Sequence, residues 1–274
     1  LYYMDKFTRN QRICLITKYL TENPNKVINL SIFTEAFNAA KSTVSEDLLI
    51  IKDMFLRFEE GRIETIAGAS GGVKYVSKIS DEESKSFVQK LCSILNDRDR
   101  IISGSFIYTT DIMCSPDIIK KAASILVSKF QEMDIDYVVT VETKGIPLAF
   151  EVSKILGKQL VVVRRENKIT EGSSVTINYM SGSTDRIQNM ILSKKALVQG
   201  SRCIFIDDFM RGGGTAQGIM SMLKEFECTL CGIGVLIDKK NVSHKLVSDY
   251  VSIVDFYENP ENNVPAFKPS KIFL

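Results

Sequence analysis

Residues 1–76 carry apolar side chains at helical spacing, followed by two short runs typical of β-strands. The helical pattern extends from Arg9 to Leu20 and is interrupted at Asn23-Pro24-Asn25. A second short helix fits Ser31 to Phe37. The pattern therefore predicts two helices at the start of this region.

The next stretch predicts a third helix and a hairpin. The helix begins at Ser42 or Thr43, where Thr43 and Glu46 have the spacing of a capping box. An apolar stripe along it would face a core: Val44, Leu48, Ile51 and Phe55. Two strands then fit residues 62–66 and 73–76, on either side of a small-residue turn. Helix, helix, turn, helix and hairpin is the order of a winged helix.

Beyond Lys78 the pattern changes to apolar runs that alternate with helices. A helix starts at Ser80, and further strands and helices are expected at 137–141, 147–156, 160–163, 203–206, 218–226 and 232–237. Continuous β-branched runs between helices predict a parallel sheet, which binds ligands at the carboxyl ends of its strands. The fold class is therefore α/β, with a winged helix-turn-helix domain at 1–77 and a parallel-sheet domain at 78–274. The tail after Phe256 is expected to be irregular.

Composition narrows the class of protein. The chain has 274 residues, 45% hydrophobic and 25% charged, which is enough to bury one or two cores. No apolar run approaches the roughly 18 residues of a membrane span, and no secretory leader is recognised, so we expect a cytoplasmic protein. The formal net charge of +2 does not by itself argue for a nucleic-acid partner.

The cysteines do not predict a metal site. Most of the six lie within apolar runs, where a reduced thiol behaves as a small hydrophobe. Cys228 and Cys231 have C-x-x-C spacing, but there is no second pair and His244 is the only histidine. Because a zinc site needs two further ligands, we expect no metal site here.

The strongest chemical signal is the segment from Cys203 to Thr215, an apolar strand that leads through two acids into a glycine-rich turn and a helix. Glycines allow backbone N–H groups to close around a phosphate, and a helix N-terminus adds favourable partial charge. Asp207 and Asp208 would repel that phosphate but suit ribose hydroxyls. The combination predicts a site for a phosphorylated sugar, whereas a glycine-rich turn alone would indicate only an ordinary strand-to-helix connection.

This segment resembles the motif by which type I phosphoribosyltransferases bind phosphoribosyl pyrophosphate (PRPP). The resemblance implies that Asp207 and Asp208 hold the ribose hydroxyls and that Arg211 to Thr215 cradle the 5′-phosphate. The loop from Glu142 to Pro147 corresponds in order to the pyrophosphate loop of these enzymes, with Lys144 adding a cation, although by itself it is typical of a plain helix-entry turn. The polar stretch 167–186 occupies the place of their mobile flap.

Between the two loops, from Arg164 to Arg202, basic residues exceed acidic ones by four, which would suit a polyphosphate ligand. The basic residues are Arg164, Arg165, Lys168, Arg186, Lys194, Lys195 and Arg202, against Glu166, Glu171 and Asp185. Most such side chains in any protein are simply solvated.

Most of the chain, from Arg12 to about Ile253, resembles the purine operon repressors of Gram-positive bacteria, in which a winged helix is fused to a transferase-like domain. The matching stretches are Ala40–Leu48, Gly68–Tyr75, Thr143–Ala149, Lys168–Ser173, Ile177–Ser183 and Asp207–Thr215. The resemblance implies a non-catalytic domain that binds PRPP as inducer, with magnesium, and guanine polyphosphate alarmones at the same site. Arg211 fits this reading, since transferases commonly carry small hydroxyl residues there. No segment is identified as a nucleobase pocket.

The resemblance extends the candidate effector site to a fuller set of residues. We expect PRPP to be bound by Tyr108, Thr143, Lys144, Gly145, Lys168, Asp207, Asp208, Phe209, Met210, Arg211, Gly212, Gly213, Gly214 and Thr215. No catalytic residue and no required cofactor are expected.

Net charge does not indicate DNA binding, because residues 1–76 carry ten Lys or Arg against nine Asp or Glu. The argument for DNA depends instead on where individual basic and polar residues lie. Phosphate contacts are expected from Lys6, Arg9, Arg12, Lys41, Lys52 and Lys74, and base contacts from Thr43 and Ser45, with Ser42 beside them. Spacing alone favours DNA binding and dimerisation or partner docking equally. The resemblance favours operator DNA. We also expect a homodimer, because a single winged helix buries little surface on DNA and two-fold symmetry doubles the interface.

Two alternatives stay open at this point. One is an active purine phosphoribosyltransferase with an N-terminal regulatory domain, and the other is a PRPP-binding protein whose helical domain docks another protein.

Overall fold

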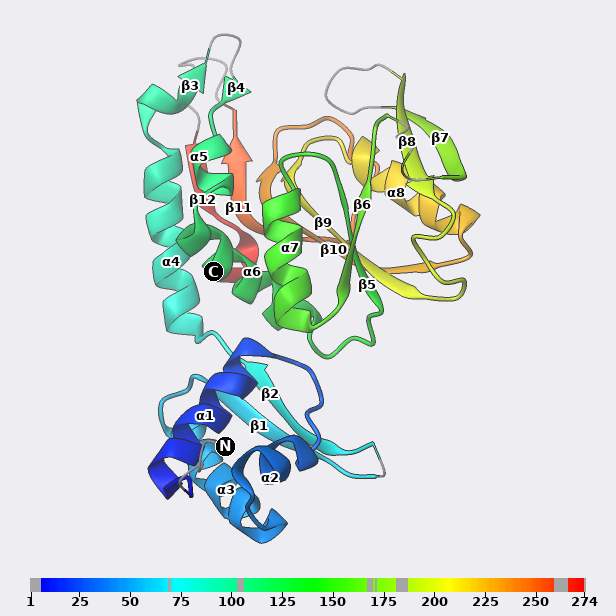
Figure 1. Ribbon diagram of the computed structural model, residues 1–274. Helices are drawn as coiled ribbons and strands as arrows, with labels where there is room; N and C mark the ends of the chain where they lie inside the picture. The colour runs from blue at the N-terminus through cyan, green and yellow to red at the C-terminus, as the bar shows by residue number, and fades with distance from the viewer. Residues whose placement is uncertain are drawn as a thin grey trace. The chain divides into compact units, whose positions relative to one another are not determined.

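The computed structural model describes residues 6–68, 70–102, 106–166, 170, 172–180, 187–258 and 266–273 (Figure 1). The chain divides into two compact units, Leu1–Ser80 with Ile155–Gly157, and Asp81–Lys154 with Lys158–Leu274. The division at Ser80 lies close to the domain boundary expected near Lys78.

The first unit contains three helices and a hairpin in the predicted order. Its elements are α1 (Arg9–Glu22), α2 (Ser31–Phe37), α3 (Lys41–Arg57), β1 (Gly61–Ile66) and β2 (Gly72–Ser77). The strands β1 and β2 are antiparallel, and Ile28, between the first two helices, forms a β-bridge with Val73. The predicted apolar stripe of α3 is confirmed, because Val44, Leu48 and Ile51 are buried and Phe55 packs against the same core.

The predicted capping box at Thr43 is wrong. The third helix begins at Lys41, its N-cap Ala40 is extended, and no side chain caps it, so Thr43 already lies inside the first turn. A capping box occurs instead on α1. There Gln11 Oε1 accepts from the Thr8 N–H at 2.9 Å, and Thr8 Oγ1 accepts from the Gln11 N–H at 3.4 Å.

The second unit is built on a six-stranded sheet with the order β12-β11-β10-β9-β5-β6. Its strands are β5 (Tyr137–Val141), β6 (Gln159–Val163), β9 (Arg202–Met210), β10 (Thr229–Lys239), β11 (Val251–Tyr257) and β12 (Ala266–Pro269). All pairings are parallel except β11 with β12. The predicted parallel sheet is thus confirmed, with one antiparallel edge strand.

Helices and a hairpin surround this sheet. They are α4 (Asp81–Leu95), α5 (Thr110–Met113), α6 (Pro116–Phe130), α7 (Ile146–Leu156), α8 (Gly214–Glu225) and the hairpin of β7 (Ser174–Met180) and β8 (Ile187–Ser193). Short elements complete the unit: η1 (Arg98–Arg100), the pair β3 (Ile101–Ile102) and β4 (Phe106–Ile107), and η3 (Lys271–Phe273).

The alternation of side chains along β9 divides the core between the two faces. Phe205 belongs to the core shared with α8 and the β7–β8 hairpin. On the opposite face, Ile206 and the α6 residues Leu126 and Phe130 surround Gly234 of β10. Figure 1 shows α7 and the hairpin on different sides of the sheet. Both faces of the central strands are therefore covered, as their continuous apolar runs predict.

Some predictions change at the ends of elements and in the tail. Strand β9 continues to Met210, so the two aspartates lie within the strand rather than after it, and α8 begins at Gly214 rather than Gly218. The tail is not wholly irregular, because β12 pairs with β11. Asn96, just beyond α4, makes two hydrogen bonds to Phe267 of β12. Its Nδ2 donates to the Phe267 carbonyl at 2.9 Å, and its Oδ1 accepts from the Phe267 N–H at 2.8 Å.

Candidate functional site

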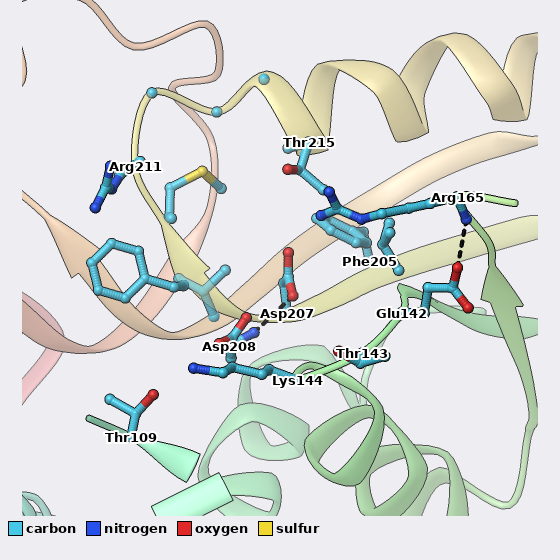
Figure 2. A pocket seen from close by; sticks show the side chains of 18 of the residues that line it. Thr109, Glu142, Thr143, Lys144, Arg165, Phe205, Asp207, Asp208, Arg211 and Thr215 are labelled. Carbon is cyan, nitrogen blue, oxygen red and sulfur yellow. Dashed lines mark hydrogen bonds between the residues drawn. The ribbon is translucent and has the colours of Figure 1, made fainter. Parts of the chain in front are cut away.

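A cavity of about 650 Å³ lies at the carboxyl ends of the central strands (Figure 2). It is lined by Ile107, Thr109, Val141, Glu142, Thr143, Lys144, Arg165, Glu166, Phe205, Asp207, Asp208, Phe209, Met210, Arg211, Gly212, Gly213, Gly214, Thr215, Ala216, Val235 and Phe256. The two glycine-containing loops singled out from the sequence thus meet at one cavity. This is the edge of a parallel sheet where ligands are expected.

One wall of the cavity is the turn between β9 and α8. Gly213 has a φ of +83° and caps the helix without a side-chain hydrogen bond. The first N–H groups of a helix have no partners within it, and residues 213–216 line the cavity. Backbone donors, the helix N-terminus and the Thr215 hydroxyl are together of the kind that can bind a phosphate group.

The two aspartates lie between this turn and the opposite loop, as Figure 2 shows. The Asp208 N–H donates to Asp207 Oδ1 at 2.9 Å. Burial, followed by the nearby Asp208 carboxylate, raises the pKa of Asp207 well above its ordinary value. A pair of carboxylates held this way can accept hydrogen bonds from adjacent ribose hydroxyls.

The opposite loop joins β5 to α7. The peptide bond between Glu142 and Thr143 is cis, and Thr143 and Lys144 are exposed at the cavity. Gly145 lies behind them, where an added Cβ would be 2.6 Å from Asp207 Oδ1 and 2.7 Å from Thr140 Oγ1. Only glycine fits this close approach, so Gly145 positions the loop against the acid rather than lining the cavity.

Arg165 is a cavity residue that the sequence interpretation did not assign to the site. Its N–H donates to Glu142 Oε1 at 2.7 Å, and its Nη1 donates to Gln188 Oε1 of β8 at 2.6 Å. Figure 2 shows its guanidinium reaching across the cavity toward Thr215. The only sequence signal was the excess of basic residues after β6, which does not distinguish Arg165 from its neighbours.

Most of the predicted effector residues line this cavity, with three exceptions. Tyr108 is 46% exposed and does not line it, although its neighbours Ile107 and Thr109 do. Gly145 lies behind the loop, and Lys168 lies outside the described residues. Among the residues described, no group of three or more His, Cys, Asp or Glu could hold a metal ion.

Asp207→Asn is expected to stabilise the protein at neutral pH, by roughly 2–5 °C in melting temperature. The folded state holds the pKa of Asp207 above its ordinary value of 3.8, so it binds more protons than the unfolded state and loses stability as pH rises above 3.8. Asparagine removes this loss and keeps the oxygen that accepts the Asp208 N–H. Melting curves at pH 4 and pH 7 check this: the stabilisation should be larger at pH 7, and a gain of equal size at both would contradict it.

In the first unit, the predicted DNA residues fall into two groups. Lys6, Lys41, Ser42, Ser45 and Lys52 are exposed, and the last four lie along α3. Ser45 Oγ donates to the Lys41 carbonyl at 2.9 Å, and Thr43 is half-buried. These α3 residues form the surface that can reach a partner.

The other predicted DNA residues are engaged with acids of the same unit. Lys74 Nζ lies 2.9 Å from Glu64 Oε2, and Arg9 Nε lies 3.5 Å from Asp47 Oδ1. Arg12 is buried: its Nε donates to Asp47 Oδ2 at 2.7 Å and its Nη1 to the Phe7 carbonyl at 2.9 Å. This pairing favours a structural role for Arg12 over a phosphate contact.

Comparisons with known proteins agree with this two-part organisation. A family model described as "Bacterial purine repressor, N-terminal" matches residues 8–77, and one described as "Phosphoribosyl transferase domain" matches residues 109–266. The chain is 44% identical over 249 residues to the purine biosynthesis transcriptional repressor PurR of Bacillus subtilis, covering 91% of this chain and 87% of that protein. The chain belongs to the PurR family.

Other PurR proteins match over a similar span. A probable purine biosynthesis transcriptional regulator PurR of Streptococcus pneumoniae is 43% identical, with 91% of each chain covered. The purine biosynthesis transcriptional activator PurR of Lactococcus lactis is 39% identical, with 90% of this chain and 91% of that protein covered. These PurR relatives are named as transcriptional regulators rather than as enzymes.

Solved structures support the fold of the second unit. An adenine phosphoribosyltransferase from Thermoanaerobacter pseudethanolicus has a TM-score of 0.53 and 16% identity, covering 61% of this chain and 99% of its own. The enzyme from Rhodothermus marinus gives 0.52 and 19%, covering 62% and 98%. At this identity the likeness shows the type I phosphoribosyltransferase fold alone. Among the described residues of this PurR-family chain, no helix is long and apolar enough to cross a membrane.

Proposed function

We propose that this protein is a DNA-binding transcriptional repressor of purine biosynthesis genes, and that PRPP is an inducer bound by its second unit without catalysis. The observation that carries the proposal is one cavity that joins a phosphate-binding turn, an aspartate pair and a second glycine-containing loop. This cavity belongs to a chain whose residues 8–77 match the N-terminal domain of bacterial purine repressors.

Each group of PRPP has a suitable partner at the cavity. The N-terminus of α8 and Thr215 suit the 5′-phosphate, and Asp207 and Asp208 suit the ribose hydroxyls. Thr143, Lys144 and Arg165 suit the pyrophosphate, because all three donate hydrogen bonds and two carry positive charge. Magnesium would enter with the pyrophosphate oxygens as ligands. We extend the proposal to guanine polyphosphate alarmones, which carry phosphate and ribose groups of the same kind.

An assay of pyrophosphate release distinguishes this proposal from the alternative of an active phosphoribosyltransferase. The purified protein, PRPP, magnesium and each of adenine, guanine, hypoxanthine, xanthine, uracil and orotate are incubated, and pyrophosphate release is followed. We expect PRPP to bind and no nucleotide to form. Sustained nucleotide formation would instead establish a phosphoribosyltransferase.

The DNA half of the proposal is tested by sequencing genomic fragments that the protein retains with and without PRPP. We expect fragments upstream of purine genes to be retained and to be released by PRPP. A reporter under such a fragment gives the sign of regulation, since the relatives include both a named repressor and a named activator. Higher reporter output in the presence of the protein would favour activation.

We propose a homodimer joined through the second unit. A single winged helix buries little surface on DNA, and two-fold symmetry doubles the interface. Sedimentation at micromolar concentration should give twice the chain mass of 30.8 kDa. A monomer that persists when DNA is added would contradict this.

Substitutions on α3 should separate affinity from sequence preference. Lys41→Ala should weaken binding to all DNA sequences and reduce the salt dependence by about one counterion, because a phosphate contact releases condensed cations. Ser45→Ala should change the preference among sequences by about 1–3 kcal/mol. Lys18→Ala on α1 serves as a control, because Lys18 pairs with Glu22 on an exposed face. If neither α3 variant changes DNA binding, this docking of α3 is wrong.

A further inference from the structure

The segment from Lys240 to Tyr250 follows β10. It contacts the turn between β9 and α8, residues 211–215, which is called the phosphate-binding turn below, from outside the cavity. The Leu246 N–H donates to the Gly212 carbonyl at 2.8 Å. Val247 is buried against Gly213, where an added Cβ would lie 2.9 Å from Val247 Cγ2. The turn is therefore supported by one hydrogen bond and one apolar contact. Both are supplied by residues that do not line the cavity, Leu246 and Val247.

Asp238 anchors this segment. It lies near the carboxyl end of β10, paired in register with Met210 of β9, and its side chain is fully buried. Lys245 Nζ donates to Asp238 Oδ1, and Lys240 Nζ lies 2.7 Å from Asp238 Oδ2. The Tyr250 hydroxyl donates to Asp238 Oδ2 at 3.0 Å and accepts from Lys245 Nζ at 2.7 Å.

The two lysines hold different parts of this network. Lys240 also reaches Asp255 Oδ1 on β11, at 3.2 Å, so it joins two strands of the sheet. Lys245 contacts only Asp238 and Tyr250 among the described partners, and it immediately precedes Leu246. A buried carboxylate requires such partners, and their geometry then fixes the backbone to which they belong.

We propose that Lys245 is a positioning residue for the phosphate-binding turn. By pairing with Asp238, it holds Leu246 and Val247 against Gly212 and Gly213, so that the N–H groups of the turn stay aimed at a 5′-phosphate. The inference rests on the proposed function of the cavity. It predicts that Lys245 governs affinity for ligands that carry a 5′-phosphate and leaves the pyrophosphate loop unaffected, because that loop belongs to β5 and α7.

The test uses calorimetry, in the presence of magnesium, to measure how the full chain binds three probes. The probes are ribose 5-phosphate, inorganic pyrophosphate and PRPP. For Lys245→Met we expect ribose 5-phosphate affinity to fall about tenfold or more, because small misplacements of binding groups are costly. Pyrophosphate affinity should stay unchanged, and Lys245→Arg should recover part of the loss. Lys129→Met, at an exposed position of α6, is the control and should bind all three probes like wild type.

Two further variants keep the test decisive if Lys245→Met leaves Asp238 uncompensated and fails to fold. Asp238→Asn combined with Lys245→Met removes both charges, and Val247→Ala removes the apolar contact alone. Each should weaken ribose 5-phosphate more than pyrophosphate. Unchanged ribose 5-phosphate affinity, or an equal loss for both probes, would overturn the inference. If wild type binds none of the three probes, the proposed function of the cavity fails as well.

Discussion

Asp208→Ala should bind operator DNA like wild type and fail to respond to PRPP. Asp208 lines the cavity, and its loss removes an acceptor expected at the ribose hydroxyls, at a cost of about 1.5–3 kcal/mol for a hydrogen bond to a charged group. This corresponds to roughly 10- to 150-fold weaker PRPP binding. A ligand can shift a conformational equilibrium only by its preference for one state, so at a PRPP concentration that just releases wild type the weakened variant stays mainly in the DNA-binding state.

The measurement is a set of DNA titrations of both proteins with magnesium, without PRPP and with PRPP at the lowest concentration that releases wild type. Asp134→Ala is a matched control, since Asp134 is exposed and engages Arg202 through its backbone carbonyl. Equal PRPP sensitivity in wild type and Asp208→Ala would place the effect outside this cavity. Loss of DNA binding in the variant without ligand would mean that Asp208 supports the fold or the DNA contact.

Arg12→Ala should destabilise the first unit by about 3–5 kcal/mol, because it leaves the buried Asp47 carboxylate without its main partner. DNA binding should fall with the folded fraction of that unit. Thermal unfolding followed by circular dichroism measures the first effect, and DNA titration below the transition measures the second. Lys18→Ala, which breaks an exposed ion pair with Glu22, should cost about 0–0.5 kcal/mol.

A double variant distinguishes a structural role of Arg12 from a direct contact between Arg12 and DNA. Arg12→Met with Asp47→Leu replaces the buried pair by apolar groups, which is often neutral or stabilising. We expect it to recover most of the stability and the DNA affinity together. If stability returns while DNA affinity does not, the guanidinium of Arg12 contacts DNA directly.

The sequence predicted those elements whose burial follows a simple period. The apolar stripe of α3 repeats at about 3.6 residues, and the run of β5 is apolar except for the buried Thr140, so local pattern and tertiary burial agree. The motif from Asp207 to Thr215 was equally accessible, because its chemistry lies in consecutive residues. The cavity gathers most of the residues predicted in this way.

Other features depend on partners distant in the chain. The role of Arg12 is set by Asp47, 35 residues away, and charge alone does not distinguish a buried pair from a phosphate contact. The edge strand β12 is four residues long and ends in Pro269, which an edge tolerates but a local pattern disfavours. Arg165 belongs to the cavity through Glu142 and Gln188, neither of which adjoins it in sequence.

The double hydrogen bond between Asn96 and Phe267 implies an order of folding during synthesis. The core of the first unit uses residues between Phe7 and Tyr75, so it can form while the rest of the chain is still on the ribosome. The second unit cannot secure the end of α4 or complete the edge of its sheet until residues 266–269 have emerged. A nascent chain would therefore acquire a folded first unit well before its second unit is complete.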